Sequence, residues 1–198
     1  MKGRVIIVTG IPGVGKTTVL KELVKEAGKK GARLNVVNYA SIMLEVAKEK
    51  EKGVGRDDLR CMPIDLQRAL QIEAAERIEK MIAVSPETIV DTHMIIRTNQ
   101  GYWTGLPLNV LRKLRPSLFV LIEAELGEIV DRRLKDKKRK RDEVLIEEVK
   151  EEMGFSRFVA ASCATLTGAP VKILKNPAGK QVEVANQLLS TIQKLRGA

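Results

Sequence analysis

Residues 10–17 of the chain read Gly10-Ile11-Pro12-Gly13-Val14-Gly15-Lys16-Thr17. Two of the glycines stand five positions apart and are followed by a lysine and a hydroxyl residue, the pattern of a phosphate-binding loop. Glycines let the backbone curl there, so that successive N–H groups face phosphate oxygens. Because glycine makes up about 7% of an average protein, a chance match in a chain of this length is on the order of one per cent. The alternative is an ordinary glycine-rich turn with an exposed lysine.

The segments on either side of this loop predict a strand and a helix. Residues 4–9 form a short apolar, β-branched run, which is typical of a buried parallel strand. Residues 16–27 repeat apolar side chains on one helical face, so a helix begins where the loop ends. The helix N-terminus adds its dipole to the attraction for phosphate. We therefore expect Lys16 to reach the β- and γ-phosphates of a nucleotide and the Thr17 hydroxyl to bind Mg²⁺.

The rest of the chain alternates short apolar runs with helical patterns. Further strands are predicted at residues 34–39, 88–91, 117–123 and 171–174, and further helices at 41–51, 65–84, 126–134, 144–165 and 182–195. This alternation predicts an α/β fold in which a parallel sheet carries helices on both faces. The 198 residues suit one such domain, and we find no repeat or linker that would divide them. Ligands of these sheets bind beyond the carboxyl ends of the strands.

One basic segment dominates the charge of the chain. Residues 132–142 hold eight Lys or Arg and two Asp, so they account for +6 of the formal net charge of +10. The segment has three readings: a lid that brings arginines to a transferring phosphoryl group, a nucleic-acid patch, or a solvated helix end. Its position after a predicted strand and helix favours the lid, and the lack of interleaved aromatic residues disfavours nucleic acid.

Cysteine usage and hydropathy bear on location. Cys61 and Cys163 are isolated and lack metal-ligand or redox spacing, which indicates free thiols in a reducing compartment. No stretch approaches the roughly 20 apolar residues of a membrane span, and a strand pattern follows the first residues directly. We therefore expect a cytoplasmic protein without membrane contact.

An acidic residue ends the predicted strand 88–91. Asp91 follows three apolar or β-branched residues, a Walker B arrangement that typically holds Mg²⁺ directly or through its water shell; a local turn cap is the alternative. His93, the only histidine, is expected to position its neighbours and not to take part in catalysis. Arg97 could fork onto an acceptor phosphate, whereas Arg56 and Arg60 are weaker candidates of the same kind.

Two classes of phosphate-loop protein can be compared at the late strand. A GTPase normally reads guanine with an Asn-Lys-x-Asp segment near such a strand, but the chain has Lys175-Asn176-Pro177-Ala178 there. The GTPase reading is therefore weakened, whereas the phosphate loop alone does not choose between a kinase and a motor protein.

The chain resembles the archaeal adenylate kinases along nearly its whole length. The resemblance rests first on residues 8–17 with their Gly-x-Pro-Gly-x-Gly-Lys loop, which is specific. It then continues through weaker matches that persuade by their order: Asn38-Tyr39, Arg56-Asp57-Asp58-Leu59-Arg60, Val90-Asp91-Thr92-His93, Arg97-Thr98, Gly101-Tyr102, Gly105-Leu106-Pro107, Arg132, Arg139-Lys140-Arg141-Asp142 and Leu166-Thr167-Gly168-Ala169.

This resemblance implies a P-loop NTPase three-layer sandwich with a five-stranded parallel sheet, an AMP-binding arm at about 38–84 and a short lid at about 132–142. It implies reversible, Mg²⁺-dependent transfer from ATP to AMP, giving two ADP, by a homotrimer. The residues that it implies to bind ATP are Gly10, Ile11, Pro12, Gly13, Val14, Gly15, Lys16, Thr17 and Thr18. Arg60 and Arg97 would hold the AMP phosphate. Arg132 would lie over the adenine of ATP, and Arg139 and Arg141 would neutralise the transferring group.

The chain departs from the family pattern at three places. Tyr39-Ala40-Ser41 stands where glycine and a polar residue are usual, and Asn99-Gln100 where proline is common. The predicted lid has no cysteine, which argues against a zinc-bearing lid. Two alternatives to adenylate kinase remain: a P-loop kinase for another nucleoside monophosphate or small acceptor, and a nucleotide-gated RNA-binding protein.

Overall fold

The computed structural model describes residues 3–56, 58–98, 101–135 and 146–195 of the chain. Its main sheet has five parallel strands in the order β2-β3-β1-β6-β7. The strands are β1 (Arg4–Thr9), β2 (Asn35–Asn38), β3 (Glu87–Asp91), β6 (Leu118–Glu123) and β7 (Val171–Lys175). The chain first builds the β2–β3 side of β1 and then crosses to β6 and β7, so the loop after β1 lies where the direction of building reverses. That is the place where open α/β sheets bind ligands.

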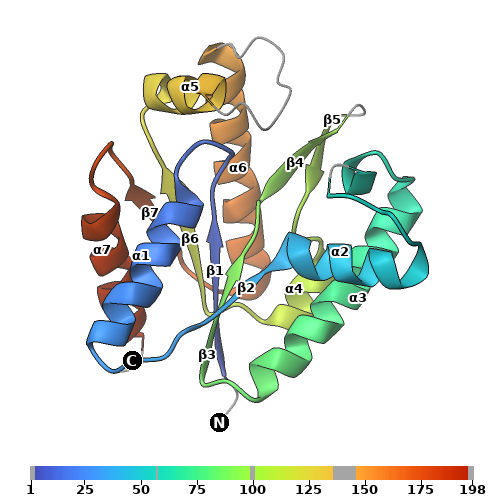
Figure 1. Ribbon diagram of the computed structural model, residues 1–198, viewed down its shortest axis with the longest axis horizontal. Helices are drawn as coiled ribbons and strands as arrows, with labels where there is room; N and C mark the ends of the chain where they lie inside the picture. Colours follow the sequence, from blue (N-terminus) through green and yellow to red (C-terminus); the bar gives the residue numbers. More distant parts are fainter. Residues whose placement is uncertain (1–2, 57, 99–100, 136–145, 196–198) are drawn as a thin grey trace.

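Helices cover both faces of the sheet (Figure 1). Helices α1 (Lys16–Lys29) and α7 (Gln181–Lys194) lie together on one face. The other face is covered by α2 (Tyr39–Lys50), α3 (Ile64–Ala83), α4 (Leu108–Leu114) and the long α6 (Ile146–Thr167). Helix α5 (Leu126–Lys135) lies above the loop that follows β1, at the carboxyl edge of the sheet (Figure 1). The predicted α/β class, with helices on both faces of a five-stranded parallel sheet, is confirmed.

The central strand β1 feeds two separate cores because its side chains alternate between faces. Val5 and Ile7 join the core under α2, α3 and α4, whereas Ile6 and Val8 join the core under α1 and α7. All four side chains are buried. This double burial explains why the segment reads as a continuous apolar run and not as an alternating one.

Four elements were not expected from the sequence. Strands β4 (Ile95–Thr98) and β5 (Gly101–Thr104) pair antiparallel in a small second sheet, so Arg97 lies on a strand. Helix α4 and the short 3-10 helix η1 (Asp58–Arg60) were also missed. The five sheet strands and the other helices occur where the sequence predicts them, with ends shifted by a few residues.

The last strand, β7, forms one edge of the sheet and is held there in part by ion pairs. Glu123, at the end of β6, is buried, and its two carboxylate oxygens accept hydrogen bonds from Nε and Nη2 of Arg157, each at 2.6 Å. Lys175, the register partner of Glu123, donates to the same carboxylate at 2.9 Å. This cluster ties β6, β7 and α6 together close to the carboxyl edge.

The end of α4 offers a test of backbone strain. Arg115 has φ 48° and ψ 61°, a left-handed conformation that is costly for a residue with a side chain. Glycine adopts it without that cost, so we expect Arg115→Gly to raise the free energy of unfolding by about 0.5–1 kcal/mol. Urea denaturation measures the change. Arg112→Gly, the same exchange inside α4, should instead lower the free energy of unfolding by about 1 kcal/mol. Equal losses of stability in both variants would contradict the left-handed conformation of Arg115.

Candidate active site

The loop between β1 and α1 has the backbone of a phosphate-binding turn. Gly13 and Gly15 have φ angles of 94° and 84°, which only glycine adopts readily. At Gly10 a Cβ atom would lie 2.5 Å from the Ile122 carbonyl oxygen of the neighbouring strand, so a side chain has no room there. The sequence therefore needs glycine at all three positions, for two different reasons.

Lys16 begins α1 and is buried against the end of β3. Its ammonium group forms an ion pair with Asp91, and Asn38 donates from Nδ2 to the second carboxylate oxygen of Asp91 at 2.7 Å. The register of the sheet explains the meeting, because Val8 and Asn38 both lie directly opposite Asp91. Burial lowers the pKa of Lys16 below that of an ordinary lysine, and the Asp91 carboxylate opposes this shift. The lysine is therefore not the exposed group of an ordinary turn.

The donor set at this point suits Mg²⁺. Thr17, exposed in the first turn of α1, offers a hydroxyl, and Asp91 offers a carboxylate; both are hard oxygen ligands. No group of three or more His, Cys, Asp or Glu that could hold a metal occurs in the described part of the chain. A metal with only two protein donors suits Mg²⁺, which keeps waters and takes further ligands from substrate phosphates.

The arginines expected on the acceptor side differ in how they are placed. Arg97 extends from β4 and makes a two-pronged ion pair with Glu148 of α6, at 2.8 and 3.3 Å. Arg56, a weak candidate from sequence, reaches the site by donating to Oδ1 of Asn38 at 3.1 Å. The backbone of Arg60 ends η1, and its side chain lies outside the described residues.

Of the arginines expected to act on the donor side, only Arg132 lies within the described residues. It belongs to the last turns of α5, where it donates to the Gly13 carbonyl oxygen at 3.2 Å and pairs with Glu128 at 2.6 Å. It thus lies beside the phosphate loop. Arg139 and Arg141 lie outside the described residues.

Three further side chains contact the phosphate loop. One is His93, for which the sequence predicted only a positional role and whose Nδ1 donates to the Gly10 carbonyl oxygen at 2.7 Å. Neither of the other two was predicted from the sequence. The missed residues are Arg133, which binds the Pro12 carbonyl, and Asn176, which binds the Val14 carbonyl. Asn176 follows a predicted strand at the carboxyl edge, as Asp91 ends one, and that position was the available signal. No sequence signal distinguished Arg133, because it stands in a run of similar basic residues.

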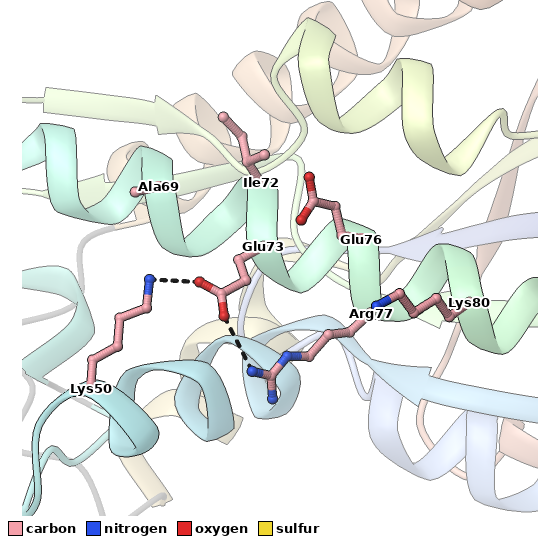
Figure 2. Close-up of a pocket in the computed structure, with 7 residues that line it drawn as sticks. All are labelled: Lys50, Ala69, Ile72, Glu73, Glu76, Arg77 and Lys80. Atoms are coloured by element: carbon pink, nitrogen blue, oxygen red, sulfur yellow. Dashed lines mark hydrogen bonds and ion pairs between the residues drawn. The ribbon is translucent and has the colours of Figure 1, made fainter.

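A surface groove of about 560 Å³ lies elsewhere, between the end of α2 and the outer side of α3 (Figure 2). Lys50 and Arg77 both form ion pairs with Glu73 (Figure 2). Arg77 also pairs with Glu49 of α2. The groove is remote from the carboxyl edge of the sheet where the phosphate loop lies. We assign it no role in the site.

The fold and the loop define a class of protein. A phosphate loop after the first strand, with a carboxylate at the end of the strand beside it, is the arrangement of P-loop proteins that handle nucleotide phosphates. The shikimate kinase of Acinetobacter baumannii, solved in complex with shikimate, has a similar fold: the TM-score is 0.57 at 13% identity, over 97% of this chain and 94% of that one. A family model described as an AAA domain matches residues 9–150. The chain has the fold of a P-loop kinase.

Sequence relatives narrow this class. An adenylate kinase of Methanocaldococcus jannaschii is 43% identical over 176 residues, which cover 89% of this chain and 91% of the relative. An adenylate kinase of Methanopyrus kandleri is 43% identical over 194 residues, which cover 98% of this chain and 100% of the relative. The chain belongs to the adenylate kinase family, as its resemblance to the archaeal members led us to expect.

Lys16 and Asp91 can be tested together. Lys16→Met should lower kcat by about 100-fold or more, because it removes charge stabilisation from the transferring phosphoryl group. It should also lower stability by about 3 kcal/mol, because the buried Asp91 loses its cation. The double variant Lys16→Met/Asp91→Asn should recover most of the stability and none of the turnover. Near-normal turnover of Lys16→Met, or a double variant no more stable than the single one, would contradict the pairing.

Proposed function

We propose that the chain catalyses reversible phosphoryl transfer from ATP to AMP. In this reaction the bond between the γ-phosphorus and the β–γ bridging oxygen of ATP breaks, and a new bond forms to an oxygen of the AMP phosphate, so that both products are ADP. The observation that carries the proposal is Lys16 in a phosphate loop, beside Asp91, in a member of the adenylate kinase family. Phosphoryl transfer needs positioning and charge stabilisation more than acid–base chemistry, which suits these residues.

On the ATP side, residues Gly10 to Thr18 cradle the phosphates. In this proposal Lys16 exchanges the Asp91 carboxylate for the β- and γ-phosphates when ATP binds. Thr17 and Asp91 hold Mg²⁺, the latter partly through water, and the ion neutralises charge on the phosphates. The hydrogen bond from Arg132 to the Gly13 carbonyl oxygen supports a contact with the nucleotide, and the resemblance assigns this arginine to the adenine. The same resemblance assigns Arg139 and Arg141 to the transferring group, as parts of a short lid at about 132–142.

On the AMP side, Arg97 and Arg60 hold the acceptor phosphate within an arm at about 38–84 and the adjoining hairpin. Arg97 already donates from both terminal guanidinium nitrogens to a carboxylate, Glu148, with the forked geometry that a phosphate also accepts. Binding of AMP would replace one anion by another at this fork. The exposed position of Arg97 leaves it accessible for that exchange.

The direct test is ADP formation from ATP in the presence of Mg²⁺, with AMP, CMP, UMP and GMP as parallel acceptors. We expect strong turnover with AMP and little with the others, lost on chelation of the metal and restored by adding Mg²⁺. Preference for another monophosphate would keep the mechanism and change the acceptor. Transfer to none of them would sink the proposal. The RNA-binding alternative has no supporting observation in the described part of the chain.

In the same assay Arg97→Ala isolates the acceptor side. Loss of a charged hydrogen bond to phosphate is worth about 1.5–3 kcal/mol, so we expect KM for AMP to rise by about 10- to 100-fold with little change in KM for ATP. Arg77→Ala is the matched control, because Arg77 also pairs with carboxylates but on the outer side of α3. Unchanged KM for AMP and normal kcat in Arg97→Ala would remove this residue from the site.

We further propose a homotrimer. The number of subunits comes from the family resemblance. Support for self-association comes from apolar side chains exposed on one side of α6, namely Phe155, Phe158 and Leu166, with Phe158 72% exposed.

Light scattering on the purified protein tests the assembly. We expect the mass of three chains, and dissociation in the variant Phe158→Glu, which places a charge in the apolar patch. Val84→Glu is the control, because Val84 is 88% exposed at the end of α3 and lies outside the patch. A monomeric parent protein, or a Phe158→Glu variant that stays trimeric, would refute the proposal.

We also propose that the protein acts in the cytoplasm. The support is chemical: Cys61 and Cys163 are both free thiols, as expected in a reducing compartment. Separately, none of the helices in the described ranges has the length and hydropathy of a membrane span. Immunoblotting of fractionated cells would refute the location if the protein were found outside the cytoplasmic fraction.

A further inference from the structure

The carbonyl oxygens of the phosphate loop are held from outside by side chains of several other elements. Four of them accept a side-chain hydrogen bond: Gly10 from His93, Pro12 from Arg133, Gly13 from Arg132 and Val14 from Asn176. The donors come from the segment after β3, from α5 and from the segment after β7. The loop is therefore held by segments that follow strands on both sides of β1.

Fixing a carbonyl also fixes the N–H group on the other side of the same peptide. Within one planar trans peptide the C=O and N–H bonds point in opposite directions. A donor on the Pro12 carbonyl thus directs the N–H of Gly13 the other way, and a donor on the Val14 carbonyl does the same for Gly15. Both glycines have positive φ and little intrinsic preference for one peptide orientation. These two peptides are the ones that most need an external hold.

Arg133 holds the first of them from a buried position. Its Nε donates to the Pro12 carbonyl oxygen at 2.9 Å, and its terminal nitrogen pairs with Glu152 of α6 at 2.5 Å. Arginine and glutamate are both buried, and a Cβ on Gly13 would lie 3.2 Å from Cγ of Arg133. A buried ion pair is often no more stabilising than an apolar pair of similar volume. Stability alone therefore does not explain the arginine, whereas a hold on the loop does.

Asn176 holds the second peptide. It is fully buried, and its Nδ2 donates to the Val14 carbonyl oxygen at 2.7 Å. Its Oδ1 is also buried and has no hydrogen-bond partner among the described residues. A Cβ on Gly15 would lie 2.5 Å from Nδ2, so the amide lies directly against the loop. Among the described residues, the polar contact of this side chain is the one with the phosphate loop.

We propose that Arg133, anchored by Glu152, and Asn176 are positioning residues that keep the N–H groups of Gly13 and Gly15 directed at bound phosphate. This inference rests on the proposed function only in taking the loop to bind ATP phosphates. It does not depend on the acceptor. Neither residue needs to touch the nucleotide, so both act through the backbone of the loop.

The test is the affinity for ATP, measured by calorimetry without any acceptor. Asn176→Leu keeps the shape of the side chain and removes the donor to Val14. Arg133→Met/Glu152→Gln removes the donor to Pro12 without leaving a buried charge. Each should raise Kd for ATP by about 10-fold, the value of one hydrogen bond. The Kd for inorganic tripolyphosphate should rise by the same factor, because the N–H groups of the loop contact phosphate and not the nucleoside. The control Arg77→Met/Glu49→Gln, on the surface of α2 and α3, should bind as the parent does.

A merely structural role predicts a different result. It would lower Tm or the number of binding-competent molecules and leave Kd unchanged; parental Kd values in both loop variants would therefore overturn the proposal. So would weaker ATP binding with unaltered tripolyphosphate binding. A parent protein that binds ATP but does not phosphorylate AMP would refute the proposed reaction and leave this inference standing. If the parent binds neither ATP nor tripolyphosphate, both fail.

Discussion

The parallel register of the main sheet is the constraint on which the site depends. Because Val8, Asp91 and Asn38 lie opposite one another, the end of β1, the carboxylate of β3 and the amide of β2 meet at one edge. A shift of one residue in β3 would turn Asp91 to the opposite face, away from Lys16. The two apolar cores that flank β1 fix this register, since each needs its own alternate set of side chains. Packing far below the loop therefore sets the geometry of the charged groups above it.

Around the loop, cations are held by carboxylates of the protein. Lys16 pairs with Asp91, Arg97 with Glu148 and Arg133 with Glu152. The first two pairs differ from the third in whether the cation is free to change its anionic partner in the proposed reaction. In that reaction Lys16 and Arg97 exchange a carboxylate for a phosphate, which keeps each cation neutralised with and without substrate. The Arg133–Glu152 pair is buried and bound to the loop backbone, so it persists as part of the scaffold.

The sequence predicts the sheet, most helices and the phosphate loop because these depend on local pattern. The loop needs glycine for its backbone angles, and buried parallel strands read as apolar runs. The hairpin of β4 and β5 was missed because each strand has only four residues, and neither forms the continuous buried apolar run of a strand in the main sheet. The contacts of Arg133 and Asn176 with the loop were also beyond prediction. Each joins positions more than 100 residues apart, and only the folded sheet brings them together.

The central place of β1 also affects how the molecule moves. Amide protons in a strand that is paired on both sides and buried on both faces exchange with solvent mainly through global unfolding. The β4–β5 hairpin pairs only within itself and is partly exposed, so its amides can exchange through local opening at far lower free energy. The phosphate loop thus follows a strand that we expect to exchange slowly, whereas Arg97 lies on a strand that we expect to exchange fast. In the proposed reaction, ATP therefore meets a rigid surface and AMP a compliant one.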